Sequence, residues 1–209
     1  MCFINHDTKI IFTQIPKTGG AAVRQSIQTS SPGSSVWVAP YHGKISKELA
    51  EKYPDYKKFT VVRNSYSIMV SMYRWWYRRN IPSPEQSRVT RNIRYAKDQP
   101  VIKSFKEWLQ WDKVAQSESD VFHQLDFLRF SDSSGQQRWH DNFTVLRYEN
   151  LEEELAMFGK RIGAPLKLTK RKIHFFGTYD WKAYYDEEIK EIVRTKCKAD
   201  IDHFKFEFQ

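Results

Sequence analysis

The sequence predicts an α/β fold in which a parallel β-sheet is flanked by helices. Short apolar runs rich in β-branched residues alternate with longer segments of helical periodicity, and the chain contains no internal repeat. Its 209 residues suit a single domain, 1–209, that is large enough to bury most of its apolar surface. Ligands of such folds bind beyond the carboxyl ends of the strands, so we expect the functional residues at that edge.

The first strand and helix are predicted at residues 9–28. The apolar run KIIFTQ at 9–14 is typical of a strand, and AAVRQSIQ after the glycines is typical of a helix. The turn between them, PKTGG, places Lys17 beside the exposed N–H groups of a helix start, an arrangement that binds phosphate or a similar anion. Lys17 precedes the glycines instead of following them as in the GxxxxGK[ST] loop, which disfavours an ordinary kinase or ATPase. A plain glycine-rich turn with a solvent-facing lysine is the alternative interpretation.

Two further strand–helix units follow the first. A strand is expected at 36–39 and a helix at 44–53, with Ser46 near the start of that helix. The continuous apolar run KFTVV at 58–62 is typical of a buried parallel strand. The segment 65–79 is apolar over a wide arc of helix surface, which predicts a buried helix.

The end of the third predicted strand carries a second group of polar side chains. Arg63 follows the strand directly, and Ser67 and Ser71 lie four residues apart on one face of the next helix. A guanidinium fork with hydroxyls at a helix start makes a second anion pocket beside the first. In the alternative interpretation Arg63 caps the edge of the sheet and Ser71 is a small packing residue.

The remainder of the chain continues the alternation after a segment of different composition. Residues 80–103 combine prolines and arginines with little periodicity, which predicts a surface loop insertion. The elements expected after it are a short helix opened by a capping box of Ser104 and Glu107, a strand at 143–147, a helix at 151–162 and a last helix at 186–199.

The net charge of +9 is concentrated in one span of the sequence. Residues 57–103 contain eleven Lys and Arg against two acidic residues, and the rest of the chain is balanced. Such an excess indicates an anionic partner, whether a nucleotide, a sulfated or carboxylated sugar, or a nucleic acid. A solvated basic face is the alternative. We expect the insertion at 80–103 to select the acceptor, and its arginines favour an anionic glycan or an acidic small molecule.

Several classes of protein are disfavoured by what the sequence lacks. It has no apolar run of about 18 residues and no charged-then-apolar leader, so we expect a soluble cytoplasmic protein that binds no membrane. Cys2 and Cys197 have no metal-ligand spacing, and two cysteines make no disulfide framework in a chain of this size. The histidines show no HExxH or paired spacing, so no metal site is expected.

The paired motifs resemble those of the PAPS-dependent sulfotransferases, especially the carbohydrate branch that includes the heparan sulfate 2-O-sulfotransferases. PAPS is 3′-phosphoadenosine 5′-phosphosulfate. The resemblance is carried by IPKTGG, FTVVRNSYSIMVSMYRW and FTVLRYENLEEEL, and spans roughly residues 9–79 and 143–208. It implies a P-loop-like sulfotransferase fold and transfer of a sulfuryl group from PAPS to an acceptor hydroxyl, with release of adenosine 3′,5′-bisphosphate (PAP).

The resemblance also implies which residues bind the nucleotide. Those implied to hold the 5′-phosphosulfate are Lys17, Thr18, Gly19, Gly20 and, through its N–H group, Ala21, and those implied to hold the 3′-phosphate are Arg63 and Ser71. Two departures from the family pattern stand out. Ala21 and Ala22 replace the usual Thr or Ser after the glycines, so backbone N–H groups must suffice there. Asn64 and Ser65 replace the Asp-Pro that often follows the arginine.

The same resemblance implies catalytic roles for Lys17 and His42. Lys17 offsets charge on the leaving phosphate oxygen, helped by the helix start. His42, in APYHGK, lies just beyond the second predicted strand, where the 2-O-sulfotransferases keep their catalytic histidine. An imidazole can take a proton from an acceptor hydroxyl near neutral pH. A histidine that makes a structural hydrogen bond is the alternative.

Two other functions remain open at the level of the sequence. A phosphotransferase of P-loop-like fold would bind ATP with magnesium in place of PAP. A nucleic-acid-binding module would use the basic span 57–103 and bind with steep salt dependence, but it leaves the lysine of PKTGG unexplained. No RNA-binding or zinc-finger signature supports that second alternative, and we expect no nucleic-acid partner.

Overall fold

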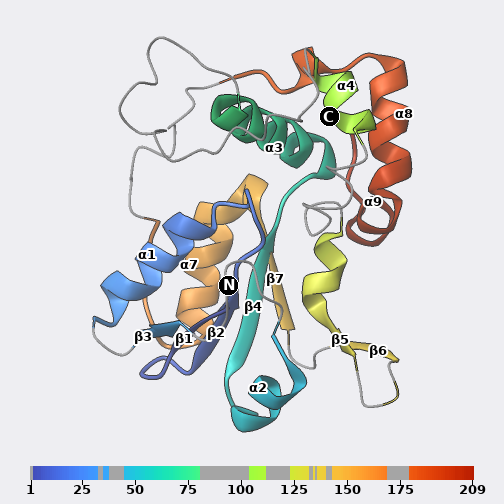
Figure 1. Cartoon of the computed structure of the whole chain (residues 1–209). Helices are drawn as coiled ribbons and strands as arrows, with labels where there is room; N and C mark the ends of the chain where they lie inside the picture. The colour runs from blue at the N-terminus through green and yellow to red at the C-terminus, as the bar shows by residue number, and fades with distance from the viewer. Residues whose placement is uncertain are drawn as a thin grey trace.

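A five-stranded sheet forms the centre of the protein in a computed structural model that describes residues 2–32, 35–37, 45–80, 104–111, 123–131, 134, 136–139, 143–168 and 179–209. The strands lie side by side in the order β3-β1-β2-β4-β7 (Figure 1). Their bounds are β1 Cys2–Asn5, β2 Ile10–Thr13, β3 Ser35–Trp37, β4 Lys57–Val62 and β7 Phe143–Arg147. A separate two-stranded sheet joins β5 (Arg129–Ser131) to β6 (Gln137–Trp139).

The sheet is parallel at its centre and antiparallel around β1. Strand β4 pairs in parallel with both β2 and β7, which confirms the predicted parallel arrangement for these three strands. The predicted parallel sheet is confirmed only in part, because β1 runs antiparallel to β2 and to β3. A four-residue turn joins β1 to β2, so the pair forms a hairpin, and Asn5 Oδ1 accepts hydrogen bonds from the N–H and hydroxyl groups of Thr8 within it. The carboxyl ends of β2, β3, β4 and β7 therefore share one edge of the sheet.

The helices follow the predicted order, with one division that the periodicity did not predict. Their bounds are α1 Gly20–Ser30, α2 Lys47–Lys52, α3 Ser65–Asn80, α4 Phe105–Gln110, α7 Leu151–Arg161, α8 Glu187–Lys196 and α9 Lys198–Phe204, with short 3-10 helices η2 Gln124–Leu128, η3 Tyr148–Asn150 and η4 Lys182–Tyr184. The single helix expected at 186–199 is wrong, because α8 ends at a non-helical Cys197 and α9 begins directly after it. None of the helices described here is long and apolar enough to cross a membrane.

Alternation along the strands assigns their side chains to two faces of the sheet. On one face, Phe12 and Phe59 stack with ring centroids 4.9 Å apart, and Phe158 of α7 covers Phe59 at 4.5 Å. Helix α1 packs on the same face through Val23 and Ile27, both fully buried. The opposite face is covered by η2, α9 and α2 (Figure 1). Burial of apolar surface stabilises a fold by about 25 cal/mol for each Å². The side chains packed on the two faces of the sheet therefore form the core of the protein.

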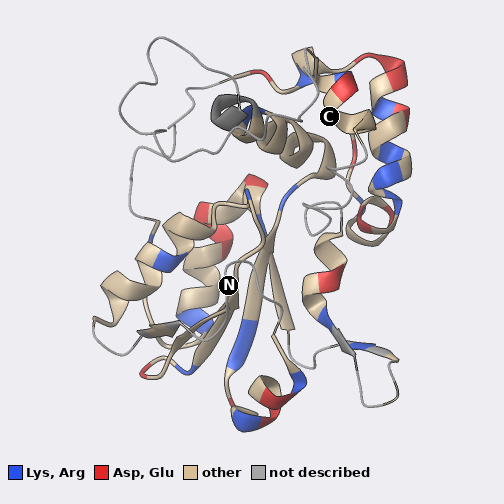
Figure 2. Cartoon of the chain, in the orientation of Figure 1, with Lys and Arg blue, Asp and Glu red and all other residues tan. Residues whose placement is uncertain are grey.

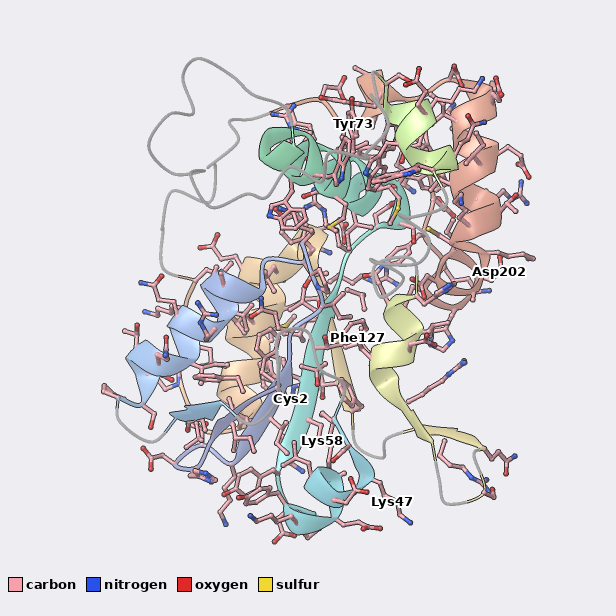
Figure 3. All side chains as sticks on the ribbon, viewed as in Figure 1. Cys2, Lys47, Lys58, Tyr73, Phe127 and Asp202 are labelled. Atoms are coloured by element: carbon pink, nitrogen blue, oxygen red, sulfur yellow. The ribbon has the colours of Figure 1, made fainter. Side chains whose placement is uncertain are left out.

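Helices α3, α4 and α8 pack together beyond the carboxyl edge of the sheet (Figure 1). Tyr73 points from α3 toward α4 (Figure 3), where its ring centroid lies 5.4 Å from that of Phe105 and 5.8 Å from that of Trp108. Burying several large aromatic side chains in one cluster contributes strongly to packing. The cluster therefore anchors α3, and with it the start of α3 at the end of β4.

Candidate anion-binding site

The turn between β2 and α1 has the backbone shape of an anion-binding loop. Lys17 and Gly19 have positive φ angles of 64° and 82°, whereas Thr18 between them does not. Such alternation turns successive N–H groups toward one side and makes a concave site for an anion. A lysine in the left-handed region costs about 1 to 3 kcal/mol, a strain that proteins concentrate at functional sites.

The start of α1 leaves backbone N–H groups without an intrahelical acceptor. The Gly19 carbonyl accepts from the N–H groups of Ala22 (2.9 Å) and Val23 (3.3 Å). No hydrogen bond in the described part of the chain has the N–H of Gly20 or Ala21 as donor, and the first turn of α1 carries no acidic side chain. These N–H groups and the positive end of the helix dipole suit an anionic oxygen.

Arg63 brings a guanidinium to this turn from the end of β4. Its Nε donates to Ser67 Oγ (2.9 Å), and its Nη1 donates to the carbonyl oxygen of Lys17 (3.1 Å). Its face lies over the ring of Tyr148, with 4.2 Å from Cζ to the ring centroid. The two turns that the sequence marked as anion sites are thus joined by a direct hydrogen bond.

The charge of Arg63 is buried, and no carboxylate in the described part of the chain neutralises it. The side chain is 9% exposed, and the described residues include no ion pair to it. Two of its N–H groups donate within the chain, and no described acceptor meets Nη2. Buried charges in proteins are normally paired, because an isolated one is costly to remove from water. An anionic ligand at Nη2 would supply the missing partner.

Asn64 fixes the start of α3 at the position that the sequence predicted. Its Oδ1 accepts from the N–H of Tyr66 (3.0 Å), as an N-cap side chain does, and its Nδ2 donates to the carbonyl oxygen of Glu207 (2.7 Å). Its N–H donates to Glu149 Oε1 (2.8 Å). The departure from Asp-Pro at 64 and 65 therefore leaves a capped helix that begins at Ser65.

The described residues that the motifs imply for nucleotide binding lie in one region, but they differ in which polar groups are available to a ligand. Lys17, Gly19, Gly20 and Ala21 form the turn, but the Thr18 hydroxyl donates to the carbonyl oxygen of Ile15 (2.9 Å) and is buried. Thr18 can therefore contribute only its N–H group.

The hydroxyl that contacts the guanidinium comes from Ser67, whereas Ser71 lies one turn further along α3 and is partly exposed. His42 and residues 81–103 of the insertion predicted at 80–103 lie outside the described residues. Strand β3 ends at the same edge of the sheet as β2, but β1 separates the two strands.

Three residues of the site were missed as functional candidates by sequence reasoning. Tyr148 and Glu149 stand in the motif FTVLRYENLEEEL, in which no site residue was predicted, and they contact Arg63 and Asn64. Gln124 binds the backbone of Arg63 from 61 residues away. The tyrosine and glutamate after a strand end could have been found from their position, but no local pattern marks the glutamine.

A pocket of about 380 Å³ lies beside the turn, between the start of α1 and the start of α7. Gly19, Ala22, Tyr148 and Leu151 line it together with three acidic residues, Glu149, Glu152 and Glu153. Three acidic side chains repel an anion. The lining of this pocket therefore disfavours an anion, in contrast to the Lys17 and Arg63 side of the turn.

The basic residues of the span 57–103 do not form one face in the part of the chain described. Lys57 and Lys58 begin β4, and Arg63 follows its other end, roughly 16 Å away at the usual strand rise. Figure 2 shows basic positions at both ends of β4, and Figure 3 places Lys58 in the half of the strand away from α3. The candidate site therefore depends on Arg63 and Lys17 and not on the overall excess of charge.

A comparison of this chain with protein-family models finds no match, and a comparison with curated proteins finds none either. Within the described ranges, no three His, Cys, Asp or Glu side chains are grouped so that they could hold a metal ion.

Proposed function

We propose that this chain is a PAPS-dependent sulfotransferase of P-loop-like fold that moves a sulfuryl group to an acceptor hydroxyl, on a carbohydrate or small molecule, and releases PAP. The observation that carries the proposal is the buried guanidinium of Arg63, which has no described carboxylate partner and is hydrogen-bonded to the Lys17 turn. A nucleotide with anionic groups at both its 3′ and 5′ positions needs two adjacent anion sites. Arg63 and the amide groups at the start of α1 fit that need.

Each residue of the site has a role that its position supports. When bound, PAPS would supply the sulfuryl group and the leaving phosphate. Arg63 would bind the 3′-phosphate through Nη2, as a guanidinium fork suits phosphate oxygens. The N–H groups of Gly20 and Ala21 would hold the 5′-phosphate, and Lys17 would offset the negative charge that develops on it. Catalysis of this kind is mostly positioning and electrostatic stabilisation.

The base for the acceptor hydroxyl is proposed to be His42. An imidazole of ordinary pKa, about 6.5, is largely neutral at pH 7 and can accept the proton that the hydroxyl loses. Acceptor selection is proposed for the insertion at 80–103, whose arginines favour an anionic glycan or small molecule.

Thermal unfolding with and without nucleotides tests the proposal. PAP without magnesium should raise the melting temperature, because a ligand at 100 times its Kd stabilises the folded state by about 2.7 kcal/mol. ATP with magnesium should have little effect. Stabilisation by ATP with magnesium and none by PAP would instead identify a phosphotransferase. Incubation with PAPS and a panel of hydroxyl-bearing acceptors, read by mass spectrometry, would then identify the acceptor.

A further inference from the structure

We infer that Gln124 and Asp200 are positioning residues of the anion site, because they hold the backbone of Arg63 through a chain of buried hydrogen bonds. The inference rests on the proposed function in one respect, namely that Arg63 binds the 3′-phosphate. It extends the site to η2 and α9, which lie on the face of the sheet opposite α1 and α7 (Figure 1).

Gln124 binds both backbone groups of Arg63. The N–H of Arg63 donates to Oε1 (2.8 Å), and Nε2 donates to the carbonyl oxygen of Arg63 (2.9 Å). Because one backbone group is a donor and the other an acceptor, this pairing fixes the orientation of the side-chain amide. Gln124 is fully buried, and its side-chain amide gives the Arg63 backbone the acceptor and donor that a neighbouring strand would give. The Arg63 backbone is thereby held against both translation and rotation.

Asp200 in turn holds the residue that binds Arg63. Its two carboxylate oxygens accept from the N–H groups of Gln124 (2.6 Å) and Leu125 (2.9 Å). These are the first two N–H groups of η2, which have no acceptor within that short helix. Asp200 is fully buried in α9. Four hydrogen bonds therefore connect the C-terminal helix to the guanidinium-bearing residue, across three segments far apart in the sequence.

The hydrogen-bonded network of Arg63, Gln124 and Asp200 buries polar groups at a position where apolar side chains would be enough for packing. A buried carboxylate carries a desolvation cost, and each member of this chain has its hydrogen bonds satisfied. What it fixes is the origin of the Arg63 side chain, whose far end is already set by Ser67 and Tyr148. Displacing such a group by about 1 Å can cost up to about 10²-fold in function. Rigid placement of the guanidinium is therefore the consequence of the network.

Isothermal titration calorimetry with PAP and with adenosine 5′-monophosphate, which lacks the 3′-phosphate, tests the inference. Gln124→Met keeps the length of the side chain and removes its donor and acceptor. We expect its Kd for PAP to rise about tenfold or more, with its Kd for the monophosphate unchanged within about twofold. Asp200→Asn keeps the shape and one acceptor oxygen, so a smaller loss in the same sense is expected. It serves as the test if Gln124→Met does not fold.

Ile4→Ala is the matched control, since Ile4 is 1% exposed in β1 and belongs to a separate group of buried side chains with Cys2, Ile11 and Ile45. It should lower the melting temperature and leave the ratio of the two Kd values at the wild-type level. If the Gln124 and Asp200 variants also keep that ratio, while Arg63→Ala loses it, the positioning inference is overturned and the proposed function stands. A wild-type protein that does not distinguish PAP from the monophosphate overturns both.

Discussion

The guanidinium of Arg63 lies 4.2 Å above the ring of Tyr148, although 85 residues separate the two in sequence. Arg63 directly follows β4 and Tyr148 directly follows β7, and these two strands are neighbours in the sheet. A cation of either kind can lie over an aromatic face, but only the planar guanidinium can stack flat on it. The ring therefore sets the plane of the fork and leaves its edge for hydrogen bonds with Lys17, Ser67 and, as proposed, a phosphate.

Replacing Arg63 should remove the contribution of the 3′-phosphate to binding. Arg63→Ala is expected to weaken PAP binding by about 2 to 5 kcal/mol, the range for a desolvated charge pair that loses one partner. Arg63→Lys should recover only part of the loss, because a lysine keeps the charge but neither the fork nor the stacking on Tyr148. Calorimetric titration gives both values. Adenosine 5′-phosphosulfate is the control, and equal losses for the two nucleotides would mean that Arg63 only supports the fold.

Gly19 in the turn should tolerate an added side chain less well than Gly163, which has a similar backbone conformation outside the site. Gly19 (φ 82°) and Gly163 (φ 72°) both have positive φ, and a Cβ at Gly163 would meet no atom within 4 Å. A Cβ at Gly19 would lie 3.1 Å from Leu151 Cδ2 and 3.2 Å from Tyr148 Cε2. Gly163→Ala should cost about 1 kcal/mol of unfolding free energy, from the backbone alone.

Gly19→Ala should cost more than Gly163→Ala and should also weaken PAP binding, because the displaced tyrosine supports Arg63. Urea denaturation gives the two free energies of unfolding, and titration gives the two PAP affinities. Equal stability of the two variants together with wild-type PAP affinity in Gly19→Ala would contradict this account of the turn.

Local signals were enough to predict the elements that carry the two turns. The run KFTVV is continuous and rich in residues typical of strands, and it makes up the last five residues of β4, all of which are buried. Ser104 accepts a hydrogen bond from the N–H of Glu107, as the predicted capping box indicated, and Ser46 and Asp186 cap α2 and α8 in the same way. Such features depend on residues close in sequence. They therefore hold without knowledge of the tertiary contacts.

The parts that the sequence could not predict depend on distant contacts. Strand β1 has only four residues, CFIN, and its antiparallel direction follows from pairing with both neighbours rather than from any pattern within it. Gln124 and Asp200 are polar residues in segments without clear amphipathic order, and their partners lie 61 and 76 residues away. A buried polar network leaves no period in the sequence.

Asp200 should make the stability of the protein depend on pH. Burial raises the pKa of its carboxyl from 3.8 to about 6, although the N–H groups of Leu125 and Gln124 favour the charged form; nearby His123 also favours it and Asp126 opposes it. With the folded-state pKa raised, the stabilisation is fully present below about pH 4 and is lost as the pH rises through about 6. The difference between 3.8 and about 6 corresponds to about 3 kcal/mol.

Chemical denaturation of the wild type and Asp200→Asn between pH 4 and pH 8 measures this effect. The free energy of unfolding of the wild type should fall relative to that of the variant by about 2 to 3 kcal/mol as the pH rises across this range, since the asparagine does not titrate. Parallel pH curves for the two proteins would show that the Asp200 carboxyl does not change its protonation on folding.

His42 should affect turnover and leave nucleotide binding intact. We propose Lys17 and Arg63 for nucleotide binding and His42 for proton transfer, so binding and chemistry should separate on mutation. His42→Ala is expected to keep the fold and the PAP affinity and to lower kcat by about 10² or more, the scale lost with a general base. In the wild type, kcat should fall as the pH drops through the imidazole pKa, because an imidazolium cannot accept a proton, and this acid limb should vanish in the variant.

Asp200, with a pKa of about 6, titrates near the ordinary pKa of an imidazole, so a loss of activity at acid pH has two candidate sources. Separate measurement of the PAP affinity and of kcat distinguishes them. Protonation of Asp200, with a pKa of about 6, weakens one acceptor behind Arg63 and should change the affinity for PAP. Loss of the His42 base should change kcat alone. We therefore expect Asp200→Asn to keep the acid limb of kcat and His42→Ala to abolish it. If His42→Ala turns over like the wild type from pH 5 to pH 8, His42 is structural and the base belongs to another residue or to the substrate.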